Sequence, residues 1–447
     1  MKKLFEQFYN NKVLSIAAKI CGALMPRINN LKKYKNILKT VSSINAQKLK
    51  ITSNPISIRI APICVCNYSC QFCEIHKDNL LYPNRSRNEI DLEFIHNYEF
   101  FLSTAYFLNF YGGSEEPLLN KNFGNFVQYI KQKYGTKMTV ITNASMLNKN
   151  LSDILINHKF DTLLVSYHAA SKEGYKMLMT GKVERVNQNL NYLKNQKNRL
   201  AQKKPVVQFN FALQRLNAKE YPLIFKNSKK FDVSKVIVNK YYGGRNLLQD
   251  KNVAYDYDTE EGNQLLDEIY AHAKQKNINL HPKKPSYWSK LTSTDWSPEN
   301  FVASKKCFLP WTDLHFNPVL DDNNCHYVGI CNRIELFKIA YDKIQFRTQE
   351  QFNLLWNHAA LQYLRNTVNT IDTINPICKY CKNVNRETLR NVDAQKYAEI
   401  RDIAVQNFFK ELRRLYRFDE IKGITVLEEN PNNDAHYRDA LKAKSEN

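Results

Sequence analysis

The sequence predicts an α/β fold built on a parallel sheet, and three observations carry that prediction. Strand-like runs alternate with helical patterns between about residues 51 and 245. Three closely spaced cysteines directly follow the first run, and a second set of cysteines appears beyond residue 300. With 447 residues, 43% of them hydrophobic, the chain is about three domain lengths and can bury a large core.

Residues 1 to 50 are expected to form a basic helical extension. They hold eleven Lys or Arg against the single Glu6. Apolar residues recur there at helical spacing: Phe5, Tyr9, Val13, Ile16, Ile20 and Leu24. Such a helix either packs on the main domain with a solvated lysine face or lies on an anionic membrane surface. The net charge of +22 comes without a recognisable nucleic-acid module, which disfavours a nucleic-acid partner.

Six segments are expected to be strands, with helical patterns between them. The segments are Ile56–Ile63, Tyr106–Tyr111, Met138–Thr142, Thr162–Tyr167, Val206–Leu213 and Lys235–Tyr241. One face of the helix between the fourth and fifth strands carries Val183, Val186, Leu190 and Leu193. Asn217 is placed to cap the next helix, around residues 221 to 225. A further helix is expected over Glu261–Ala273.

Three cysteines after the first strand carry the chemistry of this segment. Cys66, Cys70 and Cys73 stand in the order Cys-Asn-Tyr-Ser-Cys-Gln-Phe-Cys. This spacing lets three thiolates hold three corners of a cubic iron–sulfur cluster and leaves the fourth iron without a protein ligand. An open coordination position favours chemistry over electron transfer alone. The alternatives are a zinc site, for which His76 would be the fourth ligand, and a pair of redox thiols.

The CxxxCxxC spacing, with the aromatic Phe72 before the last cysteine, resembles the signature of the radical S-adenosylmethionine (radical SAM) superfamily. The resemblance implies a [4Fe–4S] cluster whose free iron is chelated by S-adenosylmethionine, with Phe72 at the cofactor site. It also implies reductive cleavage to a 5′-deoxyadenosyl radical that abstracts a substrate hydrogen. The implied fold over residues 51 to 300 is a partial (β/α)6 TIM-like barrel, with its active site at the C-terminal ends of the strands.

The ends of later strands add to this resemblance. Residues 111 to 120 read Tyr-Gly-Gly-Ser-Glu-Glu-Pro-Leu-Leu-Asn and are similar to the Gly-Gly-Glu motif of the family, which implies cofactor contacts at Gly113 and Glu116. Glu115 stands where relatives have a glycine. Ser166 takes the place of a group that contacts the ribose or methionine part of the cofactor. The alternatives are an ordinary surface turn and a serine that satisfies backbone groups.

Two departures concern the region after the fourth strand. Many members of the peptide-modifying branch have an arginine before the glycine that precedes the fourth helix. Thr180 stands there, before Gly181, so that contact is not carried over. His168 is interpreted as a polar residue with satisfied hydrogen bonds rather than a ligand.

The second set of cysteines comprises Cys307, Cys325, Cys331, Cys378 and Cys381. Two single cysteines and a CxxC pair can close a four-thiolate site. The surrounding sequence resembles the SPASM/twitch extension of radical SAM enzymes, which implies an auxiliary [4Fe–4S] cluster on Cys307, Cys325, Cys378 and Cys381 within residues 301 to 385. A four-cysteine structural zinc site is the alternative. For Cys331 three roles stay open: replacing Cys325, donating a hydrogen atom, or burial, the commonest fate of such a residue.

Residues 386 to 447 are expected to form a helical tail, with a helix near Tyr397–Leu415. The stretch from Leu14 to Met25 is too short to span a bilayer. Ten cysteines, most of them in metal-like clusters, favour a reducing, cytoplasmic location, with membrane-surface contact through residues 1 to 50 as a further possibility.

These parts predict a radical SAM enzyme that abstracts hydrogen from a peptide or protein, with oxidation or crosslinking assisted by the auxiliary cluster. The alternative substrate is a small alcohol, a sugar or a lipid-linked glycan precursor. A non-catalytic iron–sulfur or zinc-binding scaffold is the alternative of another class. An external flavodoxin- or ferredoxin-like electron donor is implied, and no catalytic side chain is identified.

Overall fold

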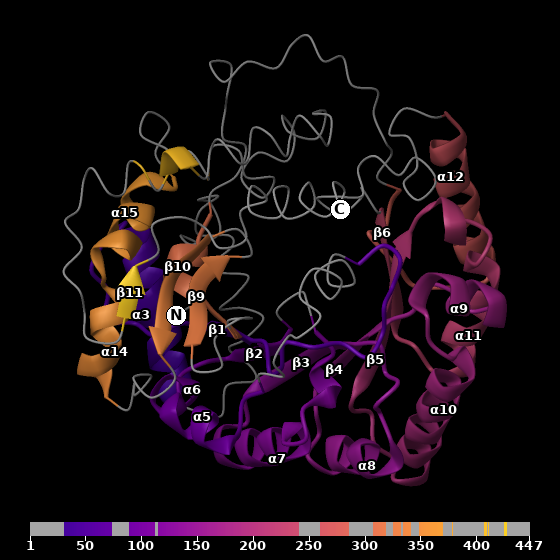
Figure 1. Cartoon of the computed structure of the whole chain (residues 1–447), viewed down its shortest axis with the longest axis horizontal. Helices are drawn as coiled ribbons and strands as arrows, with labels where there is room; N and C mark the ends of the chain where they lie inside the picture. Colours follow the sequence, from indigo (N-terminus) through magenta and orange to yellow (C-terminus); the bar gives the residue numbers. More distant parts are fainter. Residues whose placement is uncertain are drawn as a thin grey trace, which may run out of the picture.

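One sheet of eleven strands runs through the residues that the computed structural model describes. These residues are 31–73, 89–111, 115–240, 260–285, 307–318, 325–331, 334–340, 348–369, 378, 406–408, 410 and 424–426. The strand order is β11-β10-β9-β8-β1-β2-β3-β4-β5-β6-β7. The strands β1 to β6 follow a curved line, and helices lie along its outer side (Figure 1).

Seven strands, β1 to β7, are parallel neighbours in chain order. Their bounds are β1 Ser57–Ile60, β2 Phe107–Phe110, β3 Lys137–Thr142, β4 Thr162–Ser166, β5 Val206–Leu213, β6 Lys235–Lys240 and β7 Leu280–His281. Each of the first six lies within one residue of an expected segment or inside it. The α/β class with a parallel sheet is therefore confirmed.

One helix, α3, precedes these parallel strands, and the others connect them. Their bounds are α3 Leu31–Asn45, α5 Leu92–Asn97, α6 Glu99–Leu102, α7 Phe123–Tyr134, α8 Lys149–Asn157, α9 Lys172–Met179, α10 Val183–Arg199, α11 Tyr221–Lys230 and α12 Glu260–Gln275. The four apolar residues expected on one face of α10 are all buried. The expectation for Asn217 is wrong: Asn217 closes a capping box with Gln214 in the short 3₁₀ helix Arg215–Asn217, and Glu220 is the N-cap of α11.

Four strands extend the sheet on the other side of β1. Their bounds are β8 Asp313–Pro318, β9 Cys325–Cys331, β10 Ile334–Ala340 and β11 Ile424–Val426. β8 is parallel to β1, and its first residue, Asp313, pairs with Ser57. β9, β10 and β11 follow in antiparallel pairing. The first strand of the chain therefore lies between β2 and a strand that comes about 250 residues later.

The short helices α13 Leu309–Thr312, α14 Gln349–Trp356 and α15 Ala359–Thr367 hold the segment that precedes β1. Trp311 Nε1 donates to the Lys48 carbonyl and Trp356 Nε1 to the Ser53 carbonyl, both at 2.9 Å. Arg365 Nη1 donates to the Leu49 carbonyl at 2.9 Å. These bonds join residues from both sides of the domain boundary expected near residue 300.

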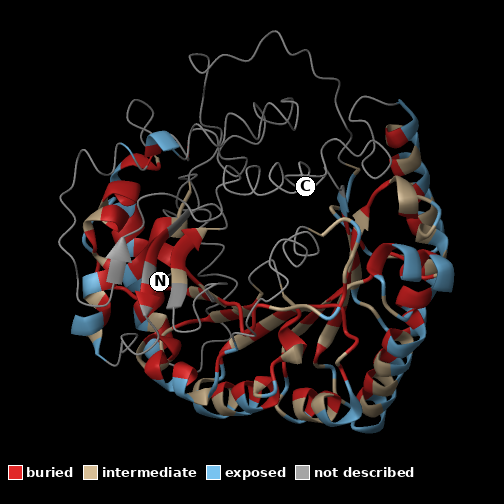
Figure 2. Ribbon diagram, viewed as in Figure 1, coloured by how far each residue is buried: buried red, intermediate tan, exposed pale blue. Residues whose placement is uncertain are grey.

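Burial alternates along the strands and defines two faces of the sheet. Ile58 and Ile60 in β1 are fully buried in the main core cluster, together with residues of the surrounding helices. Ser57 and Arg59 alternate with them and are only partly buried. We call the face that carries Ser57 and Arg59 the inner face, because it is opposite to the helices. In Figure 2 the exposed residues gather on the outward sides of the helices.

No helix in the described part of the chain has the length and apolar character to cross a membrane. In the basic extension expected over residues 1 to 50, the apolar pattern from Phe5 to Leu24 lies outside the described residues, whereas Leu31–Asn45 is the helix α3. Most of the expected tail helix also lies outside the described residues, although Phe408 is buried and packs on Tyr363. The basic extension and the tail therefore stay predictions.

Candidate functional site

The three cysteines of the CxxxCxxC segment line one pocket, at the edge of the sheet where β1 to β4 end. Its cavity volume is about 190 Å³. Three of the four residues expected at the cofactor, Phe72, Glu116 and Ser166, lie in the same wall. The fourth, Gly113, lies outside the described residues. Segments separated by up to a hundred residues are thus brought to one place.

The end of α9 holds the cysteine loop. Gln71 N–H donates to the Leu178 carbonyl at 3.0 Å, and the Cys70 thiol lies 3.8 Å from the Met179 carbonyl. Carbonyls at a helix C-terminus have no partner within the helix, so they are available to a neighbouring loop. Ser69 N–H donates to Thr180 Oγ1 at 2.8 Å. The residue at the family's arginine position therefore contacts the loop backbone.

Gly181 leaves room for a tyrosine of the same loop. A Cβ added at Gly181 would lie 2.3 Å from Cζ of Tyr68 and 2.5 Å from its Oη. Tyr68 is buried and packs edge-to-face on Tyr175, with ring centroids 6.3 Å apart. Because Tyr68 lies between two cysteines in the sequence, this close approach helps to fix the path of the loop.

The thiols that line the pocket do not converge on a single point in the described part of the chain. Within the described ranges, no three His, Cys, Asp or Glu side chains are grouped closely enough to hold one ion. A tetrahedral zinc would need sulfur atoms about 3.8 Å apart, since each Zn–S bond is about 2.3 Å long. A cubane binds each thiolate to a different iron and accepts a wider spacing. His76, which the zinc alternative requires, lies outside the described residues.

Burial makes the thiols poor redox nucleophiles. It raises the pKa of Cys66 to about 12, and it raises the pKa of Cys70 as well. Reactive cysteines have a lowered pKa, so this environment disfavours the alternative of a redox pair. Metal coordination deprotonates a thiol outright, and iron would therefore overcome the same burial. The chemistry of the donor set agrees with a cluster.

The carboxylate of Glu116 joins the ends of β2 and β3. It accepts hydrogen bonds from Thr142 Oγ1 at 2.5 Å, from Asn143 N–H at 2.6 Å and from Leu118 N–H at 3.1 Å. Complete burial raises the pKa of Glu116 to about 7, and these three donors oppose the rise. Glu116 N–H also donates to the Val65 carbonyl at 3.0 Å, next to Cys66. Glu116 thus braces the pocket, and each of its carboxylate oxygens accepts at least one hydrogen bond.

Asn143 connects the end of β3 to the cysteine loop. Its Nδ2 donates to Asn67 Oδ1 at 3.0 Å and lies 4.0 Å from the Cys66 sulfur. Asn67 Nδ2 in turn donates to Ser145 Oγ at 2.9 Å. The Thr-Asn-Ala sequence at the end of β3 is visible in the chain, but its contact with Cys66 depends on how the strands are arranged. Asn143 was therefore not among the expected site residues.

The contacts of His168 agree with its interpretation as a polar residue with satisfied hydrogen bonds. Its Nδ1 accepts a hydrogen bond from Ala212 N–H at 3.0 Å. Burial lowers the pKa of His168 to about 4, so the ring is neutral at pH 7. Phe72 packs edge-to-face against it, with ring centroids 5.0 Å apart. Ser166 lies nearby, where β4 ends, in the same pocket wall.

Three further wall residues were not expected from the sequence: Tyr111, Glu115 and Met179. Tyr111 directly follows β2, and Met179 is the last residue of α9. Glu115 directly precedes Glu116 and was noted only as a departure from the family motif. The signal that could have found them is their position at the end of an element, because the ends of parallel strands meet at one edge.

Strand β9 separates two of the later cysteines. Cys325 is its first residue and Cys331 its last, so at about 3.3 Å per residue their backbones lie roughly 20 Å apart. In the β8–β9 pairing, His315 is level with Gly329. The β8–β9 pairing ends there, and Cys331 lies two residues further along β9, beyond an irregularity in its pairing with β10, towards the end of the hairpin where β8 begins. Cys325 lies at the opposite end of this hairpin.

Cys307 precedes the start of β8 and is held there by Asn369. Its N–H donates to Asn369 Oδ1 and its carbonyl accepts from Asn369 Nδ2, both at 2.8 Å. Cys307 and Cys331 pack against the main core cluster, which contains the buried Cys378. Cys381 lies outside the described residues.

Residues 60–202 match the family model of the Radical SAM superfamily. The matched stretch includes the cysteine loop, Glu116, Ser166 and the end of α9.

Among solved structures, the fold is similar to that of Streptococcus suis SuiB. With SuiB bound to S-adenosylmethionine the TM-score is 0.54 at 14% identity, covering 87% of this chain and 84% of that one. With SuiB bound to its precursor peptide SuiA the TM-score is 0.50 at 13% identity, covering 83% and 77%. At such low identity the likeness concerns the fold alone.

Two curated relatives match shorter stretches. An S-adenosylmethionine-dependent nucleotide dehydratase of Selenomonas ruminantium is 34% identical over 105 residues, covering 23% of this chain and 35% of that protein. The GTPase Obg of Brachyspira hyodysenteriae is 27% identical over 158 residues, covering 34% and 23%. The chain thus spans a quarter to a third of the length of these relatives. Its sequence has no GxxxxGK[ST] phosphate-binding loop, so the second match brings no GTPase motif.

Proposed function

We propose that this protein is a radical SAM enzyme that abstracts hydrogen from a peptide or protein substrate. The observation that carries the proposal is the meeting of three cysteines, at cluster spacing, with the ends of β2, β3 and β4 around one cavity. When bound, a [4Fe–4S] cluster and S-adenosylmethionine supply the 5′-deoxyadenosyl radical after one-electron reduction.

The residues of this chain hold, orient and enclose these groups. Cys66, Cys70 and Cys73 are the ligands of the cluster. Ser166 offers a hydroxyl to the cofactor, and Phe72 covers it from the cysteine loop. Glu116 keeps the ends of two strands together through three accepted hydrogen bonds, and its Oε2, which accepts one of them, can still accept one from the cofactor ammonium. The backbone of the glycine pair, including Gly113, is the other expected contact.

An auxiliary [4Fe–4S] cluster is the second part of the proposal. We assign it to Cys307, Cys331, Cys378 and Cys381, in place of the set with Cys325. The support is the direction of β9, which is antiparallel to β8 and ends at Cys331, on the side of the hairpin where β8 begins and Cys307 precedes it. Such a cluster would assist oxidation or crosslinking of the substrate.

A peptide substrate is supported by the fold similarity to SuiB, whose structure contains a precursor peptide. A small molecule is the second candidate, and the match to a nucleotide dehydratase favours it. An alcohol, a sugar or a lipid-linked glycan precursor belongs to the same class. Electrons would come from an external flavodoxin- or ferredoxin-like donor, and residues 1 to 50 would contact a membrane surface if the substrate is lipid-linked.

The test is anaerobic reconstitution followed by chromatographic detection of 5′-deoxyadenosine. Cys66→Ala should abolish its formation from S-adenosylmethionine and dithionite, because one cluster ligand is lost. Cys64→Ala is the matched control: this buried neighbour lies outside the motif, and its variant should retain formation of the nucleoside. Unchanged production by Cys66→Ala would place the active cluster elsewhere.

Metal analysis separates the enzyme from a zinc-binding scaffold. Two [4Fe–4S] clusters correspond to about eight irons per chain. About four irons would remove the auxiliary cluster from the proposal. Zinc in place of iron in protein purified without oxygen would support the non-catalytic scaffold instead.

A further inference from the structure

An arginine stands on the inner face of the sheet, between the two cysteine regions. Arg59 is the third residue of β1 and is level with Asn109 in β2 and with His315 in β8. The loop with Cys66 follows the end of β1, whereas Cys331 ends β9 beyond the last β8–β9 pair, on the side of the sheet where β8 and β1 begin. Arg59 thus lies part-way between the two groups of candidate cluster ligands.

The guanidinium of Arg59 is stacked on the wall of the pocket. Its Cζ lies 4.3 Å from the centroid of the Tyr111 ring, and Tyr111 lines the cavity of the three cysteines. Stacking on an aromatic ring fixes the plane of a guanidinium and leaves its edge, with the N–H groups, for a planar anion. The side chain is held in place without using its hydrogen-bond donors.

These donors have no partner in the described part of the chain. Arg59 Nε is buried without a hydrogen bond, and no described residue forms an ion pair or hydrogen bond with the guanidinium. Arg365 offers a contrast, since it stacks on Trp356 but donates to the carbonyls of Pro310 and Leu49. Arg365 therefore stabilises the fold through its hydrogen bonds, whereas the N–H donors of Arg59 are available to a ligand.

Asp313 is the acidic neighbour of Arg59: burial raises the pKa of the Asp313 carboxyl and the charge of Arg59 opposes that rise, but no direct ion pair joins these two described side chains. The carboxylate of Asp313 already accepts a hydrogen bond from Thr312 Oγ1 at 2.5 Å and another from Ser57. Burial and the charge of Arg59 hold the pKa of His315 well below its ordinary value, so His315 adds no second cation. A partly buried cation without a paired acid is costly unless a ligand supplies the anion.

We propose that Arg59 binds an oxyanion of the substrate, a carboxylate or a phosphate, on the inner face of β1. A guanidinium pairs bidentately with either group. This inference rests on the proposed function and narrows its substrate to molecules with such a group close to the carbon that loses hydrogen. In a peptide the group is an Asp, a Glu or the C-terminus. In a nucleotide or a lipid-linked precursor it is a phosphate.

Isothermal titration of the reconstituted full-length protein tests the inference at constant ionic strength. Succinate and glutarate are the carboxylate probes, and inorganic phosphate and pyrophosphate are the phosphate probes. We expect one probe class to bind the wild type, and Arg59→Gln to weaken that binding at least tenfold. Arg59→Lys should lose less, because an ammonium keeps the charge but not the fork. Arg199→Gln, at an exposed end of α10, is the matched control and should bind as the wild type does.

The preferred probe class identifies the source of the oxyanion: carboxylates indicate a peptide, and phosphates indicate a nucleotide or lipid-linked substrate. Absence of binding to the wild type, or equal binding by Arg59→Gln, overturns the inference. If Arg59→Gln does not fold, labelling of the wild type by phenylglyoxal replaces it. Protection of Arg59 by the probe supports the inference, and unprotected labelling contradicts it.

The two proposals fail separately. Probe binding requires no cleavage of S-adenosylmethionine, so binding that depends on Arg59 can persist when the cysteine test fails. Nucleoside formation that depends on Cys66, together with probe binding that ignores Arg59, would leave the enzyme and remove only the oxyanion site.

Discussion

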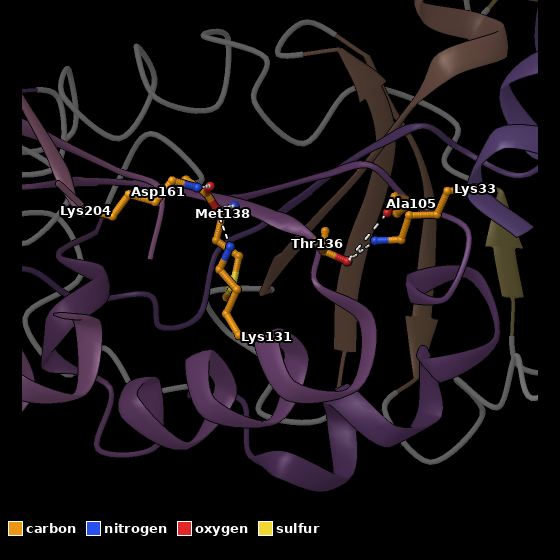
Figure 3. A network of polar contacts seen from close by, with 7 residues as sticks. All are labelled: Lys33, Ala105, Lys131, Thr136, Met138, Asp161 and Lys204. Carbon is orange, nitrogen blue, oxygen red and sulfur yellow. Dashed lines mark hydrogen bonds and ion pairs between the residues drawn. The ribbon is translucent and has the colours of Figure 1, made fainter. Parts of the chain in front are cut away.

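Buried ionisable groups have different surroundings at the two ends of the parallel strands. Where β2 and β3 end, the buried Glu116, with its pKa raised to about 7, borders a cavity lined by three cysteines. Where β2 and β3 begin, the buried Lys33, with its pKa lowered to about 7, is part of a packed network (Figure 3). Lys33 Nζ donates to Thr136 Oγ1 at 2.8 Å, and this oxygen lies 3.5 Å from the Ala105 carbonyl.

The same network continues around Asp161. Its carboxylate pairs with Lys131 and Lys204 and accepts a hydrogen bond from Met138 N–H at 2.9 Å (Figure 3). These contacts tie α7, β3 and the segment before β5 together, and none of these residues lines the cavity. The comparison teaches that a shifted pKa does not by itself mark a functional site. A cavity and metal-ligand side chains distinguish the other edge.

The largest expected effect concerns the cysteines of β9. If Cys331 is a cluster ligand, the end of the sheet where the parallel strands begin also carries a metal centre. Cys331→Ala should lose about half of the iron, as one of two clusters is lost. Cys325→Ala, at the other end of the same strand, is the matched control and should retain it. Iron analysis and electron paramagnetic resonance measure both variants. Iron loss from Cys325→Ala alone would restore the ligand set expected from the sequence.

A smaller effect is expected from replacing Gly181, because the nearest neighbours of a Cβ added at this glycine all belong to Tyr68, in the loop that carries the first three cysteines. Its replacement by alanine forces the buried Tyr68 ring aside and should cost about 1–3 kcal/mol, with a changed resonance spectrum of the first cluster. Gly135→Ala is the control. Gly135 has φ +58° with open space around it, so the variant should lose about 1 kcal/mol and leave the spectrum unchanged. An unchanged spectrum in Gly181→Ala would show that this glycine does not position the loop.

The smallest expected effect is the contribution of Lys33 to the pH dependence of stability. Lys33 lies at the end of the sheet where the strands begin, away from the cavity. Burial, and then the charge of Lys131, lower the pKa of Lys33 to about 7, and Asp161 opposes them; in the unfolded chain it is about 10.4. Between these values the unfolded state binds more protons, so the contribution of Lys33 to stability rises with pH. Its slope is at most about 1.4 kcal/mol per pH unit.

Lys33→Met should remove this slope. Its melting temperature should exceed that of the wild type near pH 6.5, and the difference should shrink towards pH 9.5. The exposed Lys35→Met is the control, and its melting temperature should follow the wild type across the same range. A constant difference between Lys33→Met and the wild type would show that Lys33 does not titrate in this window.

Local patterns were sufficient for the parallel strands and for the cysteine loop. Strand β1 was recognisable because Ile58 and Ile60 alternate with partly buried residues, and α10 because its apolar residues share one face. Asn217 shows the limit of such patterns: it has the right residue type for a helix cap, but it caps an intervening 3₁₀ turn that the sequence does not announce.

Local sequence patterns do not predict contacts between strands that are distant in the sequence. The sequence shows Cys325 and Cys331 only as close neighbours, and the β8–β9 register is needed to place them at opposite ends of a hairpin. Arg59 reads as an ordinary residue of a strand until Tyr111 and His315 are placed beside it. Whether the sheet closes as a partial barrel, and whether residues 301 to 385 form a separate domain, stay predictions.

The position of β1 between β2 and β8 has a consequence for biogenesis. A ribosome adds roughly 5–20 residues per second, so β8 is made on the order of ten to fifty seconds after β1. During that interval one side of β1 has no permanent neighbour, and the nascent loop with the first three cysteines is anchored to an incomplete sheet. If the loop holds the proposed cluster, its iron would therefore be inserted either while the sheet is still incomplete or after β8 has been made.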